Sequence, residues 1–210
     1  MKKLYAIFGG NFDPIHYGHI YVSEKLLKEI AISKITFLPN SNPPHREKTK
    51  TSIIDRLKMI KLAIKNNPNF NISYLETKTK KIFYTIDTLK KIRMQIGFAN
   101  SLCFIIGEDN LQNLHLWKDW NKILLYSHLL VYPRMKIKKN LEIKHWINLH
   151  ITKDYRLLHQ KSLGLVFFSN MDVIHISSSE IRNNYLIGKS SHKLLPPLVH
   201  RYILSKKLYM

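Results

Sequence analysis

Two histidines three residues apart, His16 and His19, close the segment GGNFDPIHYGH at residues 9–19. Side chains three apart on a helical turn point the same way, so both imidazoles can donate hydrogen bonds to one phosphate whose charge grows in a transition state. The two glycines let the backbone approach an oxyanion without a Cβ in the way. The segment therefore predicts phosphate chemistry. A His-x-x-His metal site is the alternative, but no third ligand cluster stands near the pair.

A second pattern suited to phosphate stands near the other end, in ISSSEIR at residues 176–182. It lies at an expected strand-to-helix junction, as the first segment does. Serine hydroxyls and the free N–H groups at the start of a helix can hold phosphate. Arg182 adds a planar fork of donors that suits the β- and γ-phosphates of a nucleotide.

Short apolar runs alternate with amphipathic segments, which is typical of strand–helix–strand units. The pattern predicts an α/β fold, Rossmann-like and doubly wound, with a mainly parallel sheet and helices on both faces. Strands are expected at 3–8, 34–38, 70–74, 102–106, 129–132, 165–168 and 173–176. Helices are expected at 17–30, 55–65, 84–94 with Thr85 as N-cap, 178–186 and 198–208, and loops with an irregular helix within 136–160. Ligands of such sheets bind beyond the carboxyl ends of the strands, where both patterns fall.

The length of 210 residues suits a single domain over 1–210, with a helical portion from about residue 178. The formal net charge of +20 is spread along the chain and not gathered into one arm, which favours a solvated surface over a nucleic-acid partner. The single cysteine, Cys103, excludes an intrachain disulfide. No apolar stretch approaches a membrane span, so a cytoplasmic protein is expected. The oligomeric state is left open, and a homo-oligomer is compatible with the sequence.

Residues 9–19 resemble the G-G-x-F-D-P-x-H-x-G-H signature of the nucleotidyltransferase superfamily, and residues 176–182 are similar to its I-S-S-[ST]-x-I-R motif. Further segments resemble the bacterial nicotinate-nucleotide adenylyltransferases within that superfamily. They are LPNSNPPHR at 38–46, YTIDTL at 84–89, FIIGEDNL at 104–111, and Trp117. The resemblance runs from about Leu4 to Leu204, and 136–160 is its weak stretch.

The resemblance implies transfer of AMP from ATP to nicotinate mononucleotide, giving nicotinate adenine dinucleotide and pyrophosphate in NAD synthesis. His16, His19 and Arg182 would be catalytic. Mg²⁺ would arrive with ATP, held mostly by substrate and water, so no metal site made by the protein is expected. The ATP-binding residues would be Gly9, Gly10, Asn11, Phe12, Gly18, Gly107, Asp109, Ile176, Ser178 and Ser179. The acceptor-binding residues would be Asn40, His45, Arg46, Tyr84, Thr85, Trp117 and Arg134.

Two positions depart from the family pattern, because Asn11 replaces a usual hydroxyl residue and Lys118 replaces a frequent tyrosine. One competing hypothesis is an adenylyltransferase that acts on nicotinamide mononucleotide or phosphopantetheine. The segments 39–46 and 84–89 argue against it. The other is a basic RNA-binding protein without catalysis, which would show steeply salt-dependent RNA affinity and no release of pyrophosphate.

Overall fold

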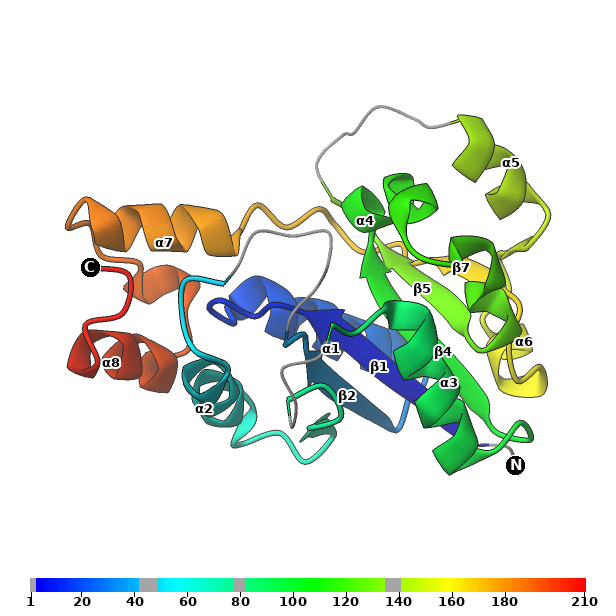
Figure 1. Ribbon diagram of the computed structural model, residues 1–210, viewed down its shortest axis with the longest axis horizontal. Coiled ribbons are helices and arrows are strands. Elements are labelled where there is room, and N and C mark those ends of the chain that lie inside the picture. The colour runs from blue at the N-terminus through cyan, green and yellow to red at the C-terminus, as the bar shows by residue number, and fades with distance from the viewer. Residues whose placement is uncertain (1–2, 42–48, 78–81, 135–140) are drawn as a thin grey trace.

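The computed structural model describes residues 3–41, 49–77, 82–134 and 141–210. Within these ranges the strands form one sheet in the order β3-β2-β1-β4-β5-β7-β6, and each neighbouring pair is parallel (Figure 1). The strands are β1 (Leu4–Gly10), β2 (Lys34–Pro39), β3 (Phe70–Ile72), β4 (Ser101–Gly107), β5 (His128–Tyr132), β6 (Ile151–Thr152) and β7 (Val166–Phe168).

Helices fill the connections between the strands, and two more follow the last strand. They are α1 (Tyr17–Glu29), α2 (Ile53–Ile64), α3 (Thr85–Ile96), α4 (Glu108–Gln112), α5 (Leu141–Asn148), α6 (Arg156–Gln160), α7 (Ser178–Leu186) and α8 (Pro197–Ser205). The described residues also form three 3₁₀ helices, η1 (Leu114–Leu116), η2 (Trp120–Leu125) and η3 (His192–Leu194). The expected α/β architecture with a parallel sheet is confirmed.

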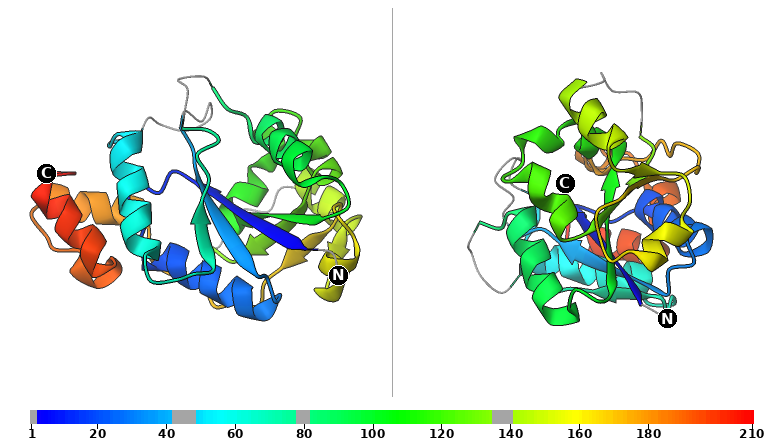
Figure 2. Two further views of the ribbon diagram at one scale, coloured as in Figure 1. Left: turned by 90° about the horizontal axis from the view of Figure 1, so that it is seen from below. Right: turned by 90° about the vertical axis from the view of Figure 1, so that its right-hand side faces the viewer.

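Both faces of the sheet are buried, which explains why its central strands are apolar at most positions. Along β4, Cys103 and Ile105 belong to the core on the side of α1, α2 and α8. Their neighbours Phe104 and Ile106 belong to the core on the side of α3, α4 and α5. The right-hand view of Figure 2 shows α1 and α3 on opposite sides of the strands. The alternation along each strand therefore divides one sheet between two cores.

The expected strand at 173–176 is wrong. β7 already pairs with β5 on one edge and β6 on the other, so no free edge remains beside it. The segment runs toward α7 without strand pairing, and Ile174 and Ile176 pack against the core from it. The expected N-cap at Thr85 is also wrong by one residue, because Tyr84 takes the extended N-cap conformation and Thr85 is the first helical residue.

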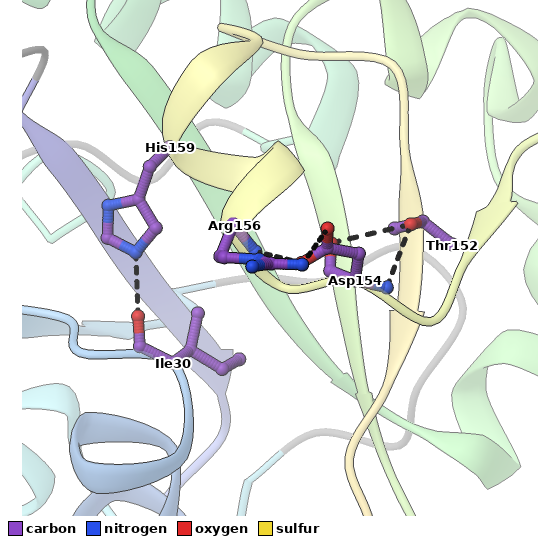
Figure 3. Close-up of polar contacts among 5 residues, drawn as sticks. All are labelled: Ile30, Thr152, Asp154, Arg156 and His159. Carbon is purple, nitrogen blue, oxygen red and sulfur yellow. Dashed lines mark hydrogen bonds and ion pairs between the residues drawn. The ribbon is translucent and has the colours of Figure 1, made fainter.

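Residues 141–160, which the sequence left least determined, form α5, the short edge strand β6 and α6. Figure 3 shows polar contacts that hold β6 and α6. Nε2 of His159 lies 2.7 Å from the carbonyl oxygen of Ile30 at the end of α1, and it must carry the proton because a carbonyl only accepts. Asp154 accepts from the backbone N–H of Arg156 at 3.0 Å, and its own N–H donates to Thr152 Oγ1 at 3.1 Å. These bonds fix α6 between β6 and α1.

A buried polar cluster closes the amino ends of β4 and β5. His128 accepts at Nδ1 from the N–H of Leu165 at 3.0 Å and donates from Nε2 to the carbonyl of Lys161 at 3.1 Å. Burial lowers the pKa of His128 to about 4, so the ring is neutral at pH 7. Beside it, the fully buried guanidinium of Arg93 donates to the carbonyls of Gly97, Asn100, Tyr126 and Ser162.

The two last helices, α7 and α8, lie at the end of the molecule toward which β1 points, and α8 packs beside α2 in both Figure 1 and Figure 2. The hydroxyl of Tyr202 on α8 donates to Asp55 Oδ1 in the first turn of α2 at 2.8 Å. That α7, α8 and the sheet make a single domain stays a prediction. None of the helices in the described ranges is long and apolar enough to cross a membrane.

Candidate active site

A cavity of about 420 Å³ lies beyond the carboxyl ends of β1, β2, β4 and β5. It is the place where a parallel sheet of this kind offers its loops to a ligand. Segments far apart in the sequence line it together. From the expected set, the lining includes Gly9, Gly10, Asn11, Phe12, His19, Asn40, Tyr84, Thr85, Asp109, Trp117, Arg134, Ser178, Ser179 and Arg182.

Some expected residues lie behind the lining or outside the described ranges. His16 and Gly18 border a much smaller hollow next to His19 and Arg134. Gly107 and Ile176 support the wall without lining it, Gly107 because its Cα approaches Tyr132 and Asp109 too closely for a side chain. His45 and Arg46, expected to bind the acceptor, lie outside the described residues.

The end of β1 and the loop after it, residues 9–16, are packed so closely that Gly9 and Gly10 are required there. A Cβ placed on Gly9 would lie 3.0 Å from the ring of Phe104, and one on Gly10 would lie 3.1 Å from the ring of Phe12. Phe12 itself takes a left-handed backbone conformation, with φ of 49°, and its side chain is buried. The loop therefore holds a single shape that brings its backbone next to the cavity.

The histidine pair is fixed by the start of α1. The ring centroids of His16 and His19 lie 3.8 Å apart. The backbone N–H of His16 donates to Nδ1 of His19 at 3.3 Å, so the proton of a neutral His19 ring sits on Nε2. Phe12 packs edge-on against His19 with ring centroids 5.0 Å apart. A Cβ on Gly18 would lie 2.9 Å from the His16 ring, so only glycine fits beneath it.

Both imidazoles are neutral at pH 7. Burial, followed by the charge of Arg134, lowers the pKa of His16 to about 3. Burial also lowers the pKa of His19, with His16 and Arg134 adding to the effect. Neither ring nitrogen of His16 has a hydrogen-bond partner among the described residues, although both are buried. Such a group is costly without a partner, and a ligand that accepts a hydrogen bond would relieve that cost.

The start of α7 faces the loop after β1 and carries Arg182 into the cavity. Arg182 donates from Nη1 to the backbone carbonyl of Asp13 at 2.9 Å and from Nη2 to Ser179 Oγ at 3.1 Å. Ser178 Oγ donates to the carbonyl of Pro14 at 2.9 Å. The two sequence patterns thus touch directly, through bonds between residues 164 and 169 positions apart. They place two helix starts and a guanidinium on the same cavity.

The opposite wall comes from α3 and η1. Tyr84 and Thr85 stand at the start of α3, and Trp117 packs edge-on against Phe104 with ring centroids 6.4 Å apart. Lys118 Nζ lies 3.2 Å from Asp87 Oδ2 and 4.5 Å from the centroid of the Tyr84 ring. Aromatic faces and the start of a helix suit a flat ring that bears a negative group.

Several residues of the site escaped the sequence reasoning. Asp13 lies inside the first motif but received no role, and Lys118 was noted only as a departure from the family pattern. Glu76 lines the cavity with no motif around it; it accepts from Thr88 Oγ1 at 2.7 Å, and burial raises its pKa. Arg56 had no local signal at all.

Arg56 joins two loops of the cavity from behind. Its side chain is 1% exposed, and its Nη1 donates to the carbonyls of Asn11 at 2.7 Å and Asn40 at 2.8 Å. Asn40 also donates its N–H to the carbonyl of Gly10 at 2.9 Å. One buried guanidinium therefore fixes the loop after β1 to the beginning of the loop after β2.

The described residues do not gather three or more His, Cys, Asp or Glu side chains that could hold a metal ion. Three carboxylates line the cavity, Asp13, Glu76 and Asp109. The first two accept hydrogen bonds from the protein, whereas Oδ1 of Asp109 is buried without one and has Arg134 Nε at 3.8 Å.

Comparisons with known proteins agree with this geometry. The cytidylyltransferase-like family model matches residues 7–184. The chain is 65% identical to a probable nicotinate-nucleotide adenylyltransferase of Buchnera aphidicola subsp. Acyrthosiphon pisum (strain Tuc7), over 100% of this chain and 98% of that protein. It is 39% identical to a protein with the same name from Pectobacterium atrosepticum, over 100% of both chains.

Solved structures share the fold. A Plasmodium falciparum nicotinic acid mononucleotide adenylyltransferase complexed with NaAD superposes with a TM-score of 0.78 at 22% identity, over 99% of this chain and 97% of that one. The same protein complexed with APC gives a TM-score of 0.74. With the phosphate-binding loops, the paired histidines and the full-length relatives taken together, this chain belongs to the nicotinate-nucleotide adenylyltransferase family.

Proposed function

We propose that this protein transfers the adenylyl group of ATP to nicotinate mononucleotide. An oxygen of the acceptor's phosphate attacks the α-phosphorus, the bond from that phosphorus to the bridging oxygen of the β-phosphate breaks, and pyrophosphate leaves. Nicotinate adenine dinucleotide is the other product. The observation that carries the proposal is the meeting of His19, Arg182 and two helix starts in one cavity, in a chain that belongs to this family.

The attacking phosphate is already a nucleophile, so no covalent enzyme intermediate and no general base are needed. Catalysis then rests on in-line positioning and on stabilising the charge that develops on the phosphates. The Nε2–H of His19 and one N–H of His16 donate to these oxygens as neutral groups. Their low pKa values suit this role, because the rings stay neutral around pH 7 and donate a hydrogen bond without a change of protonation state.

Arg182 stabilises the leaving pyrophosphate. Its two contacts, with the Asp13 carbonyl and Ser179, orient the plane of the guanidinium, and a planar fork of donors suits two phosphate oxygens. Ser178 and Ser179 add hydroxyls at the start of α7, and Gly9, Gly10 and Asn11 present the backbone of the loop after β1. Gly107 and Asp109 border the adenosine.

A divalent cation, Mg²⁺, accompanies ATP in this proposal and neutralises phosphate charge. The side chains fit such a cation held mostly by phosphate oxygens and water, since Mg²⁺ commonly keeps several waters and takes few protein ligands. The described cavity offers oxygen donors but no cluster of ligands. Asp109 Oδ1, buried without a hydrogen bond, could accept a hydrogen bond from a water bound to such a cation.

The acceptor occupies the wall made by α3 and η1. Its pyridine ring stacks on Trp117 beside Tyr84, and its carboxylate points to the N–H groups at the start of α3 near Thr85. Asn40 and Arg134 complete the described part of this subsite. His45 and Arg46, which lie outside the described residues, are proposed to bind the acceptor as well.

The test is release of pyrophosphate from Mg-ATP with nicotinate mononucleotide, compared at equal concentrations with nicotinamide mononucleotide and with phosphopantetheine. Fast release with the acid alone is the expected result. Equal rates with the amide would contradict the acid-specific assignment, and activity confined to phosphopantetheine would move the protein to another branch of the superfamily. Omitting Mg²⁺ in the presence of a chelator is expected to abolish release.

A second measurement addresses the basic surface. If the net charge of +20 served an RNA partner, the affinity for single-stranded RNA would fall steeply with salt, and pyrophosphate release would be absent. The proposed function instead requires pyrophosphate release that added RNA does not change.

A further inference from the structure

Asp13 joins four segments of the protein that the proposed reaction needs in register. Its side chain is 3% exposed. Oδ2 accepts from the backbone N–H of Lys50 at 2.7 Å, and Oδ1 accepts from Thr51 Oγ1 at 2.6 Å. Its backbone carbonyl accepts from Arg182 at 2.9 Å. The fourth partner is the hydroxyl of Tyr209, which donates to Oδ1 at 2.7 Å.

Lys50 and Thr51 end the loop that follows β2, and Asn40 begins it. Arg56 already holds the beginning of that loop to Asn11, so the carboxylate of Asp13 is the second attachment, at the other end. Both attachments are made to the loop after β1. The loop after β2, which we call the acceptor loop, begins at Asn40 and ends at Thr51. It is therefore joined at two places to residues 9–16, which we call the phosphate loop.

Tyr209 belongs to the segment after α8, residues 206–210. None of these residues lines the cavity. Two residues of this segment take left-handed backbone conformations, Lys207 with φ of 49° and Tyr209 with φ of 66°. For side chains of this size such conformations are costly, and they persist only where the surroundings fix them. The two turns fold the segment back onto the core, where the Tyr209 ring lies 6.4 Å from that of Tyr185.

The surroundings of Tyr209 are those of a fixed donor. Burial, followed by the neighbouring charge of Asp13, raises the pKa of its phenol, so the hydroxyl keeps its proton at any pH at which the protein works. Asp13 is a carboxylate with three donors in place, which leaves it little freedom to rotate. The chain thus accepts backbone strain at Tyr209 in order to place one hydroxyl on Asp13.

We propose that Tyr209 is a positioning residue for catalysis: through Asp13 it holds the phosphate loop, the end of the acceptor loop and Arg182 in their relative places. It touches no substrate. Its effect passes through one carboxylate to the group that stabilises the leaving pyrophosphate and to the loop that borders the acceptor. The inference rests on the proposed function in taking the cavity as the site of ATP.

The test compares Tyr209→Phe with Tyr202→Phe. Both variants remove one phenol hydroxyl that donates to an aspartate, at 2.7 Å and 2.8 Å, and both lie in or just after α8. Only Tyr209 is bonded to the loop after β1; the partner of Tyr202 is Asp55 on α2. Thermal unfolding measured for each variant shows whether their stabilities match, and kinetics are run well below either transition.

Tyr209→Phe is expected to lower kcat by roughly three- to tenfold, since a small misplacement of Arg182 weakens its contacts with the phosphates in the transition state as well as in bound ATP. It is expected to weaken ATP binding, measured by calorimetry, by a similar factor. Tyr202→Phe is expected to leave both within about twofold at a comparable loss of stability. Equal kinetics in the two variants would show that Tyr209 is only structural and would overturn the proposal.

A second variant keeps the test decisive. Thr51→Val removes the other side-chain donor to Oδ1 of Asp13 and, like Tyr209→Phe, does not alter the cavity lining. If both act through Asp13, the double variant departs from the product of the two single effects on kcat. Independent effects on kcat would contradict an action of both residues through Asp13.

If the wild-type protein released no pyrophosphate with nicotinate mononucleotide, the proposed function would fail. The ATP dissociation constants of these variants would still decide the inference.

Discussion

The backbone N–H of His16 points at Nδ1 of His19 from 3.3 Å, so the first turn of α1 itself determines which nitrogen of His19 carries the proton. A backbone N–H can only donate, and Nδ1 must therefore accept. The Nε2–H is left for a ligand, on a residue that lines the cavity. The tautomer of this imidazole is thus determined by main-chain geometry and needs no acidic partner.

Replacing His19 by alanine removes that donor and is expected to lower kcat by about 10² to 10³, the range found when one preorganised donor to a developing oxyanion is lost. Steady-state release of pyrophosphate measures it. The exposed His145 provides the matched control, because His145→Ala removes an imidazole far from the cavity lining. Near wild-type turnover in His19→Ala, with circular dichroism unchanged, would remove His19 from the mechanism.

Gly18→Ala tests whether the His16 ring must rest directly on the backbone of α1. The new Cβ would lie 2.9 Å from His16 Cε1 and Nδ1, so the ring has to move. Helix propensity favours alanine by about 1 kcal/mol, which offsets part of the strain in the folded state. We expect kcat to fall at least tenfold while the melting temperature changes little. An unchanged kcat would mean that the position of His16 is unimportant.

Lys118 is expected to favour the acid over the amide acceptor. Its ammonium pairs with Asp87 at 3.2 Å beside the ring of Tyr84, so without it the Asp87 carboxylate would stand uncompensated next to a negatively charged acceptor. Lys118→Met should raise the KM for nicotinate mononucleotide by about two- to fivefold, because an ion pair that is partly exposed contributes little energy. The KM for nicotinamide mononucleotide should stay unchanged.

The control for that change is Lys122→Met. Lys122 forms the same kind of pair, with Asp119 at 2.9 Å, but does not line the cavity. It should leave both KM values alone. If Lys118→Met raised the two KM values equally, the lysine would serve packing of the wall and not recognition of the carboxylate.

The stability of the fold is expected to fall in acid because of His128. Its pKa is about 4 in the folded protein and about 6.5 when unfolded, so between these values the unfolded chain binds more protons. The free energy of unfolding that depends on His128 is highest above pH 6.5, decreases as the pH falls toward 4, and does not change further below pH 4. Its size is on the order of 3 kcal/mol at 1.36 kcal/mol per unit of pKa shift.

Urea unfolding between pH 4 and pH 7 measures this dependence. His128→Gln keeps a donor and an acceptor in the pocket but cannot titrate, so its free energy of unfolding should depend less on pH than that of the wild type. His16, with a pKa of about 3, adds a similar slope that both proteins share. Identical slopes in the two proteins would show that His128 is not the titrating group.

Much of the fold could be predicted because its signals are local. The run 102–106 is apolar at every position because β4 is buried on both faces, and Gly107 ends it where the wall of the cavity needs space. The segment 173–176 is also mostly apolar, with His175 among Val173, Ile174 and Ile176, but it is not a strand. Strand formation there depends on a free sheet edge, which β6 occupies, and β6 has only two residues and no strong pattern.

The residues of the site likewise include some that the sequence predicts and some that it does not. The loops that hold His19 and Arg182 could be located because residue type and spacing carry their chemistry within one turn of helix. Arg56 and Tyr209 could not, since each acts through a contact with a residue far away in sequence, at 45 and 196 positions. Neither has sequence neighbours that mark it as more than an ordinary surface residue, and only the fold brings each one against its distant partner.

The polar cluster of Arg93 and His128 has a consequence for how this protein tolerates mutation. It lies at the amino ends of the strands, while the reaction is placed at their carboxyl ends, with the length of the sheet between them. Substitutions around Arg93 are therefore expected to reduce the folded fraction without changing the turnover of each folded molecule. Mutations at the amino ends of the strands would then change the amount of enzyme, and mutations at the carboxyl ends would change its rate.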